Sequence, residues 1–299
     1  MKNIIFTLKK TFLFIGLFSI FTISLRTSSQ SQTSGVKANF GIRGAMKSGV
    51  DSAGMDDWAQ GSSGTGVINS DGSVNSSYKW TAHVKDAAST PSSENNSVFN
   101  SGKIYDNPRT WTLKTGSAQD KDDLINTYVH ARRDANDTLW IFFGAERYGQ
   151  TGTTTMTFEF LQKGVTISGT SFNALGSDSG RTAGILTTPV TNSGGTISKT
   201  GDFLVSVDWS GSAVSTSVYM WCRNPGNGIT WNAESGYSFG WGLVNPPSGS
   251  FYGAVNSASI AGGAWGTHMK NTTDTLNVLA GGFAEVGLNL NILGVDNIS

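Results

Sequence analysis

Residues 203–221 read Phe-Leu-Val-Ser-Val-Asp-Trp-Ser-Gly-Ser-Ala-Val-Ser-Thr-Ser-Val-Tyr-Met-Trp. From Phe203 to Trp209 large apolar side chains recur at every second position, and the return stretch 214–221 repeats this spacing. A period of two is typical of β-strands, because successive side chains point to opposite faces of a sheet, whereas a helix needs a period of about 3.6. The Ser-Gly-Ser triplet between the two halves indicates a turn. The stretch therefore predicts a β-hairpin.

The same spacing recurs elsewhere in the chain. Residues 153–161 place Phe158 and Phe160 on one face and Glu159 on the other, and they follow the β-rich run 137–143 after a glycine-containing loop. We expect these two runs to pair as a second hairpin. Further strands are expected at 126–133, 237–244 and 282–290. No long amphipathic helix and no repeat is evident, so the sequence predicts an all-β fold.

The composition excludes several classes of protein. Only 14% of the 299 residues are charged, which argues against a coiled coil, and the single cysteine excludes a disulfide framework and a cysteine-based zinc site. Three histidines are too few for a histidine-rich metal centre. The 9 Trp, 16 Phe and 7 Tyr residues are enough to build a core, and the 38 glycines fit the turns between short strands.

The N-terminus has the pattern of a secretory signal peptide. Three lysines within the first ten residues precede the apolar stretch 11–25, which is shorter than the roughly 20 residues needed to span a bilayer. We therefore predict a signal peptide with a short polar follow-on at 1–31, the alternative being an uncleaved anchor. Residues 35–299 are then one antiparallel β-sandwich of the jelly-roll or concanavalin-like kind. The protein is expected to be secreted or at the cell surface, with no integral membrane span after removal of the leader.

The net charge changes when the leader is set aside. Residues 1–26 hold four basic residues and no acidic ones, so the remainder has 17 basic and 21 acidic residues and a net charge of −4. Phosphate backbones are bound by basic patches, and this domain is mildly acidic. The charge therefore gives no reason to expect a nucleic-acid partner.

Several stretches of the chain resemble a module of large secreted proteins from Bacteroidetes-type bacteria, with a related module in actinobacterial surface proteins. The stretches are KANFGIRG at 37–44, DDW at 56–58, DKDDLINTY at 120–128, LWIFFGAER at 139–147, FEFLQ at 158–162, GDFLV at 201–205 and FAEVGLNL at 283–290. The resemblance implies a secreted or cell-surface β-sandwich module, often the N-terminal region of a longer adhesin-like protein. It implies no catalytic residues. Members of this group usually continue past the last strand, so a soluble form or a truncated sequence is expected here.

Tryptophans in loop-like stretches are the first candidates for a binding site. Trp58, Trp231 and Trp241 lie next to Gly, Asn or Asp residues, and an indole face beside such side chains suits stacking against a sugar ring. The alternative is that each of these side chains is part of the core. A glycan or another cell-surface polymer is the partner that this pattern suggests.

Acidic residues are the second group of candidates. Glu159 is a weak ligand-binding candidate, and Glu146 and Glu285 are other acids on predicted strands; glycoside hydrolysis needs two carboxyl groups that face one another. Asp120, Asp122 and Asp123 cluster before a strand, where oxygen ligands can hold calcium. The alternative for the aspartates is a capped turn, and no other cofactor is expected.

Three functions are compatible with these patterns. The first, which the loop tryptophans and the resemblance favour, is a non-catalytic secreted module that recognises a glycan or a surface. The second is a polysaccharide hydrolase or lyase on a jelly roll, which requires two acids, or a basic residue with a tyrosine, converging on one concave face. The third is a structural module without a ligand, which is expected if the loop tryptophans are buried and no groove exists.

Overall fold

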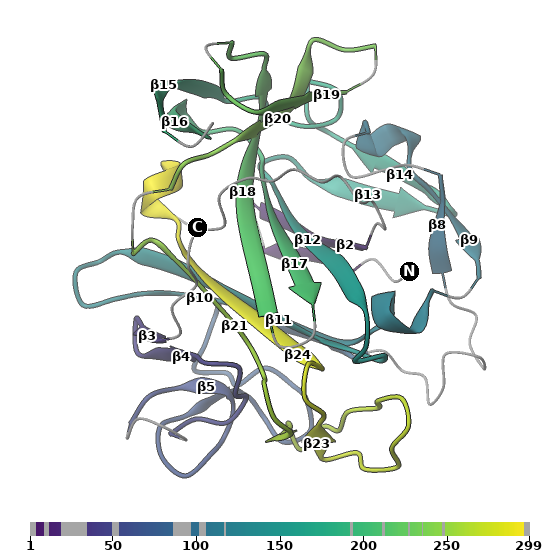
Figure 1. Cartoon of the computed structure of the whole chain (residues 1–299), viewed down its shortest axis with the longest axis vertical. Helices are drawn as coiled ribbons and strands as arrows, with labels where there is room; N and C mark the ends of the chain where they lie inside the picture. Colours follow the sequence, from purple (N-terminus) through teal and green to yellow (C-terminus); the bar gives the residue numbers. More distant parts are fainter. Residues whose placement is uncertain are drawn as a thin grey trace.

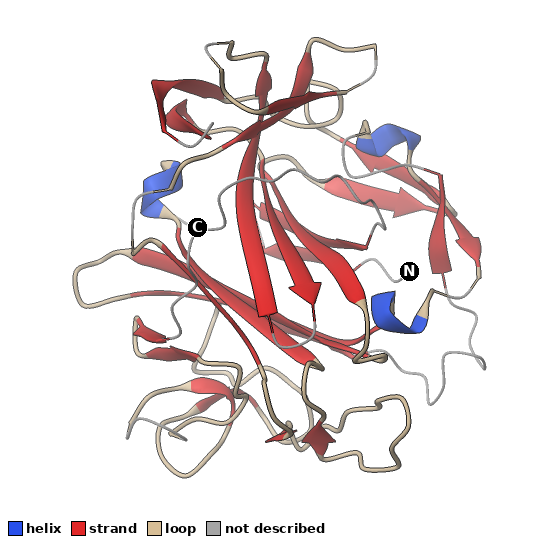
Figure 2. Cartoon of the chain, viewed as in Figure 1, coloured by secondary structure: helices blue, strands red, loops and turns tan. Residues whose placement is uncertain are grey.

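The structure is a computed structural model of the whole chain (Figure 1). It describes residues 4–8, 12–18, 35–49, 54–85, 97–101, 106–116, 118–191, 194–210, 213–226, 228–234, 236–246 and 249–295. These residues form strands and loops, with three single-turn 3-10 helices and no α-helix among them (Figure 2). The all-β prediction is confirmed.

Two large antiparallel sheets dominate the fold. The first, which we call the seven-stranded sheet, has the order β1 (Ile4–Leu8), β2 (Phe12–Phe18), β12 (Thr153–Leu161), β17 (Phe203–Ser210), β18 (Ala213–Arg223), β20 (Phe239–Leu243) and β19 (Trp231–Ala233). The second, the five-stranded sheet, has the order β21 (Phe251–Val255), β24 (Phe283–Asn289), β11 (Leu139–Arg147), β10 (Leu124–Arg133) and β7 (Thr81–Lys85).

Smaller elements surround the two large sheets. A four-stranded sheet has the order β13 (Val165–Ser168), β14 (Ser171–Ala174), β9 (Thr112–Thr115) and β8 (Ser97–Ser101). Strand pairs are β15 (Ile185–Thr191) with β16 (Gly194–Lys199), β22 (Ile260–Ala261) with β23 (Asn277–Val278), β3 (Gly35–Lys37) with β4 (Phe40–Ile42), and the parallel β5 (Asp57–Ala59) with β6 (Gly66–Ile68). The 3-10 helices are η1 (Pro108–Thr110), η2 (Asp120–Asp122) and η3 (Asn291–Leu293).

The largest core cluster contains side chains from both large sheets. Phe143 of β11 meets Phe158 of β12 with ring centroids 4.2 Å apart, and Phe160 stacks on Phe203 at 4.2 Å. The cluster is completed by the other inward-facing residues of the same strands, among them Ile141, Val205, Val207, Val218, Met220, Val286 and Leu288. The two sheets therefore pack on one another through their alternating apolar faces, as sequence period two requires.

One predicted hairpin is confirmed and the other is wrong. β17 and β18 pair as expected, with Val205 opposite Val218. The runs 137–143 and 153–161 do not pair, because β11 lies in the five-stranded sheet and β12 in the seven-stranded sheet. The loop between them crosses from one sheet to the other. The alternation of apolar residues predicts which side chains of a strand face the core, but it does not predict which strand lies beside it. Two consecutive strands that pack across the core therefore have the same sequence pattern as a hairpin.

The predicted leader is described in part. Its strand β2 pairs with the edge of β12, with Phe158 opposite Gly16, and β1 pairs with β2. The rest of residues 1–31 lies outside the described residues, and the prediction of a signal peptide stays a prediction. The boundary at residue 35 coincides with the start of β3.

The outer faces of both large sheets are also covered. Over the five-stranded sheet, a second core cluster combines Tyr128 and Phe142 with Phe40, Trp58 and Trp265 from loops and short strands. Over the seven-stranded sheet lie two smaller clusters, built around Trp111 and around Trp221 and Trp241. Polar groups on these outer faces are consequently buried, and each needs a partner within the protein.

Truncation in the central core tests this packing. We expect Phe143→Ala to lower the free energy of unfolding by about 3–5 kcal/mol, because it leaves a cavity opposite Phe158 and Phe160. Urea denaturation followed by tryptophan fluorescence measures this loss. The matched control is Ile167→Ala on β13, where 41% of the side chain is exposed and the loss should stay below about 1 kcal/mol. Equal losses in both variants would contradict the proposed core.

Candidate functional site

Two acids share the outer face of the five-stranded sheet. Glu146 on β11 lies opposite Phe283 on β24, and Glu285 on β24 lies opposite Gly144 on β11, so the two glutamates are diagonal neighbours on adjacent strands. Both side chains are fully buried, with exposures of 0% and 1%. Glu159, by contrast, lies on β12 in the other sheet. Two of the three glutamates considered from the sequence thus share one face.

Glu285 is held by three donors from the N-terminal segment. Its Oε1 accepts from the backbone N–H groups of Arg43 and Gly44, each at 2.7 Å, and its Oε2 accepts from Trp58 Nε1 at 2.9 Å. Gly44 has a φ of +67°, and a Cβ there would lie 2.6 Å from the Val255 backbone, so only glycine fits this approach. Burial raises the pKa of Glu285 to about 7, against these donors. Trp58 therefore serves as a partner of a buried acid.

Asp57 is the second acid of this cluster. Its Oδ1 accepts from the Trp58 N–H at 2.8 Å, and its Oδ2 lies 3.6 Å from Arg43 Nη2. Burial and then the neighbouring Glu285 raise the pKa of Asp57 well above its usual range. The two carboxyl groups consequently titrate as a coupled pair, because the ionisation of one opposes the ionisation of the other.

Glu146 has a separate set of partners. It accepts hydrogen bonds from the hydroxyl of Tyr128 and from Asn126 Nδ2, the latter at 3.0 Å. The Asn126 Oδ1 in turn lies 3.0 Å from His83 Nε2, and the His83 ring stacks on Tyr128 at 5.1 Å. Burial raises the pKa of Glu146, and the hydrogen bonds from Tyr128 and Asn126 oppose that shift. This acid is satisfied within the protein.

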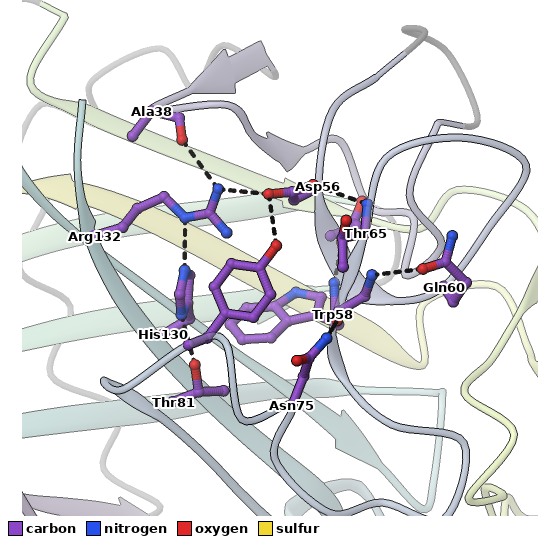
Figure 3. A network of polar contacts seen from close by, with 12 residues as sticks. Ala38, Asp56, Trp58, Gln60, Thr65, Asn75, Thr81, His130 and Arg132 are labelled. Carbon is purple, nitrogen blue, oxygen red and sulfur yellow. Dashed lines mark hydrogen bonds and ion pairs between the residues drawn. The ribbon is translucent and has the colours of Figure 1, made fainter. Parts of the chain in front are cut away.

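A third polar network attaches the N-terminal segment to β10 (Figure 3). Asp56 Oδ2 accepts from Arg132 Nη1 at 2.8 Å and from the Tyr78 hydroxyl at 3.0 Å, while Arg132 Nε donates to His130 Nε2 at 2.7 Å. Burial and the Arg132 charge hold the pKa of His130 well below its ordinary value. His130 is therefore neutral with its proton on Nδ1, which donates to Thr81 Oγ1 at 2.7 Å.

Glu159 belongs to a buried ion pair on the outer face of the seven-stranded sheet. Its Oε1 lies 3.0 Å from Arg181 Nη2, and both side chains are 0% exposed. The guanidinium carbon lies over the rings of Trp221 at 4.8 Å, Trp241 at 4.9 Å and Trp111 at 5.3 Å. Burial raises the pKa of Glu159, and the charge of Arg181 opposes this shift. Glu159 is thus a partner of Arg181 and is not accessible to a ligand.

The tryptophans predicted to stack on a glycan occupy different environments. Trp58 and Trp241 are 0% exposed, so their ring faces are covered by protein atoms. Trp231 on β19 is half-buried, packs against the central core and donates from Nε1 to the Cys222 carbonyl at 3.3 Å. Trp58 and Trp231, which were expected next to loops, lie in the short strands β5 and β19, and Trp241 lies in β20, within the strand expected at 237–244.

The three aspartates considered for calcium do not converge. Asp120 pairs with Lys270, Asp122 accepts from the Thr154 hydroxyl, and Asp123 ends the helix η2. Among the described residues, no three His, Cys, Asp or Glu side chains are grouped as metal ligands would be. Asp120 to Asp122 form the single-turn helix η2, whose N-cap residue Gln119 makes no side-chain capping hydrogen bond.

An open pocket lies at one end of the seven-stranded sheet, where β15, β18 and β20 meet. It has a volume of about 480 Å³, within the range of roughly 300–1,000 Å³ typical of small-ligand sites. Ile185 at its wall is 51% exposed. The lining residues are Asp178, Ala183, Gly184, Ile185, Leu186, Lys199, Arg223, Asn224, Pro225 and Phe239.

The residues of this pocket were not identified from the sequence. Arg223 follows Trp221 by two positions, so the period of two places both on one face of β18, and that was the available signal. Phe239 is the direct neighbour of Arg223 on β20, and Lys199 arrives at the end of β16. Those long-range pairings have no signature in the sequence.

Comparison of this chain with protein-family models, curated proteins and solved structures finds no match in any of the three. The resemblance to a Bacteroidetes-type surface module therefore stays a prediction. Across the described ranges, no helix has both the length and the apolar character needed to cross a membrane. The function is accordingly inferred from the geometry of the described side chains.

The buried ion pair gives a stability prediction. We expect Arg181→Met to lower the free energy of unfolding by about 3–5 kcal/mol at pH 7, because Glu159 is left buried without its cation. The deficit should shrink toward pH 5, since a lone buried carboxyl group is stable when protonated. The double variant Glu159→Leu, Arg181→Met should regain most of the loss. A single variant as stable as the parent chain would contradict this assignment.

The coupled pair Asp57 and Glu285 gives a pH prediction. Their raised pKa values mean that the folded protein takes up a proton at a higher pH than the unfolded chain does. The stabilisation is complete below about pH 4 and is lost as the pH rises through about 7. Between pH 4.5 and 7, the free energy of unfolding of Glu285→Gln should therefore rise relative to that of the parent chain by up to about 1.4 kcal/mol per pH unit. Urea denaturation at several pH values measures this, with the exposed Asp137→Asn as the control.

Proposed function

We propose that this chain is an exported, non-catalytic β-sandwich module of the jelly-roll kind that recognises a glycan at or near the cell surface. The observation that supports it is the open pocket of about 480 Å³ at the end of the seven-stranded sheet. The pocket combines exposed polar side chains, Lys199, Arg223 and Asn224, with the apolar walls of Ile185 and Phe239. Such a mixture suits a ligand that carries both hydroxyl groups and a carbon skeleton.

The distribution of the acids favours binding over catalysis. A glycosidase needs two carboxyl groups that reach the scissile bond, one as an acid and one as a base or nucleophile. Glu146, Glu159 and Glu285 are all 0–1% exposed and each is held by protein donors. The pocket itself contains one acid, Asp178, whose Oδ2 accepts from the Ala183 N–H at 2.8 Å. No acid pair faces the pocket.

One observation favours a second candidate function. Glu146 and Glu285 are diagonal neighbours on one sheet face, and burial raises the pKa of both. A polysaccharide-active enzyme would use such a pair if the N-terminal segment that covers it moved away. Incubation of the chain with a polysaccharide panel, followed by detection of new reducing ends or unsaturated products, separates the two functions. Our proposal expects no product, and product formation that is lost in Glu146→Gln would establish the enzyme instead.

The leader and the resemblance agree with a module at the cell surface. The basic and apolar pattern of the first 25 residues is that of an export signal, and the resembling proteins are secreted. The third function, a structural module without a ligand, predicts a chain without a usable cavity. The open pocket argues against it.

Glycan binding at the pocket can be tested with a rim variant. We expect the purified chain to bind a subset of a glycan array, and we expect Ile185→Ala with Asn224→Ala to weaken that binding at least about tenfold through lost contacts. Both residues are exposed, so the variant should keep the unfolding midpoint of the parent chain. Ile167→Ala, exposed on β13, is the control. An array without any bound glycan would overturn the proposal.

A further inference from the structure

The pocket contains two cations, Arg223 and Lys199, that form no ion pair with the described residues. Both side chains are exposed. Toward the described residues, Arg223 makes one side-chain hydrogen bond, from Nη1 to Ser238 Oγ at 3.1 Å. Since the chain without its leader has a net charge of −4, an uncompensated pair of cations in one cavity is a local exception.

Arg223 is held in place by the aromatic ring beneath it. Its guanidinium carbon lies 4.5 Å from the centroid of Phe239, which is nearly parallel to Trp221 at 6.3 Å and 21°. Trp221 in turn lies 4.8 Å from the Arg181 guanidinium. A row of alternating cations and rings thus runs from the buried ion pair to the pocket, in the order Arg181, Trp221, Phe239 and Arg223. The row restricts Arg223, so little side-chain entropy is lost when it binds a ligand.

The same row determines what the pocket can present to a ligand. The Phe239 ring carries the guanidinium on its face, so that face is not open for stacking against a sugar ring. A ligand in the pocket would instead contact the planar guanidinium of Arg223, which has several N–H donors besides the one bound to Ser238. Guanidinium groups of this kind bind carboxylates and sulfate-like oxyanions in a bidentate manner. The recognition is therefore ionic and directional.

The remaining polar groups fit the rest of a sugar. Asp178 is the single acid of the lining, and its Oδ2 is occupied by the Ala183 N–H, while its carbonyl accepts from Trp221 Nε1 at 2.9 Å. Asn224 accepts from the Gly226 N–H through Oδ1, which leaves its Nδ2 donors for ring hydroxyls. Lys199 supplies a second positive charge. The donors outnumber the acceptors, as an anionic and oxygen-rich ligand requires.

We propose that the pocket selects acidic sugars: Arg223 binds the single anionic group of a sugar unit, a carboxylate or a sulfate ester, and Lys199 supports it. This inference rests on the proposed function and specifies its ligand class. Neutral glycans lack the group that the guanidinium would bind, so they leave the two cations uncompensated.

The experiment uses the purified full chain and a glycan array that contains uronate-rich, sulfated and neutral oligosaccharides. Titration calorimetry then compares the best acidic ligand with a matched neutral form, the methyl ester of a uronate or the desulfated sugar. We expect the acidic form to bind at least about tenfold tighter, and we expect binding to weaken as sodium chloride is raised, because salt screens an exposed ion pair. The uronate and sulfate arms identify which anionic group is bound.

Charge variants assign the selectivity to the pocket. Arg223→Gln should reduce binding of the acidic form to the level of the neutral form, and Lys199→Gln should give a smaller loss. Lys114→Gln, an exposed lysine on β9 outside the pocket, removes the same charge and should leave binding unchanged. Unfolding midpoints verify that each variant remains folded.

The possible outcomes distinguish the two proposals. If only neutral glycans bind, or if acidic and neutral forms bind equally and the rim variant abolishes both, the acid selectivity is overturned while the glycan-binding function stands. If acidic glycans bind but Arg223→Gln binds them as tightly as the parent chain does, the assignment to this pocket is overturned. If no glycan binds, both proposals are overturned.

Discussion

The buried contact between Glu159 and Arg181 is the interaction on which the outer face of the seven-stranded sheet depends. Two charges at 0% exposure are stable only if they compensate one another and if further groups satisfy the guanidinium. The Asp106 carbonyl, 2.6 Å from Arg181 Nη1, and the rings of Trp111, Trp221 and Trp241 supply those contacts. The pair thus connects β12 to the loop before β15 and, through Trp111, to the four-stranded sheet. Arg181 also contacts Trp221, which stacks on Phe239 at the pocket.

The five-stranded sheet follows the same rule with different partners. Its outer face carries Glu146 and Glu285, and the N-terminal segment and Trp265 cover both. Each acid is satisfied by donors from elements distant in sequence, such as Trp58 for Glu285. Covering a polar sheet face in this way demands many specific contacts, because an unpaired buried carboxylate costs several kcal/mol, about the size of a typical domain's stability. The consequence for function is that these acids are bound by partners within the protein, whereas the side chains of Arg223 and Lys199 are exposed at the pocket.

Some elements could be predicted from the sequence and others could not. The hairpin at 203–221 was predictable, because a turn triplet joins two alternating runs within one stretch of chain. The hairpin expected from 137–143 and 153–161 was wrong, because a chain that crosses between sheets has the same alternation. Trp58 and Trp241 have small or polar neighbours in sequence that suggested accessible rings, yet both side chains are fully buried. Arg181 gave no signal, since its partner Glu159 and its three tryptophans lie on four other segments.

The sequence by itself determined the all-β class, the faces of the main strands and the mild negative charge outside the leader, because period two and composition are local properties. Only the tertiary structure decided which polar residues are buried partners and which are exposed. That division depends on contacts between segments that are far apart in the chain, such as Gly44 with Glu285 or Arg223 with Phe239. Burial is a collective outcome of packing, so one arginine, Arg181, forms a buried ion pair, whereas another, Arg223, is exposed at the pocket.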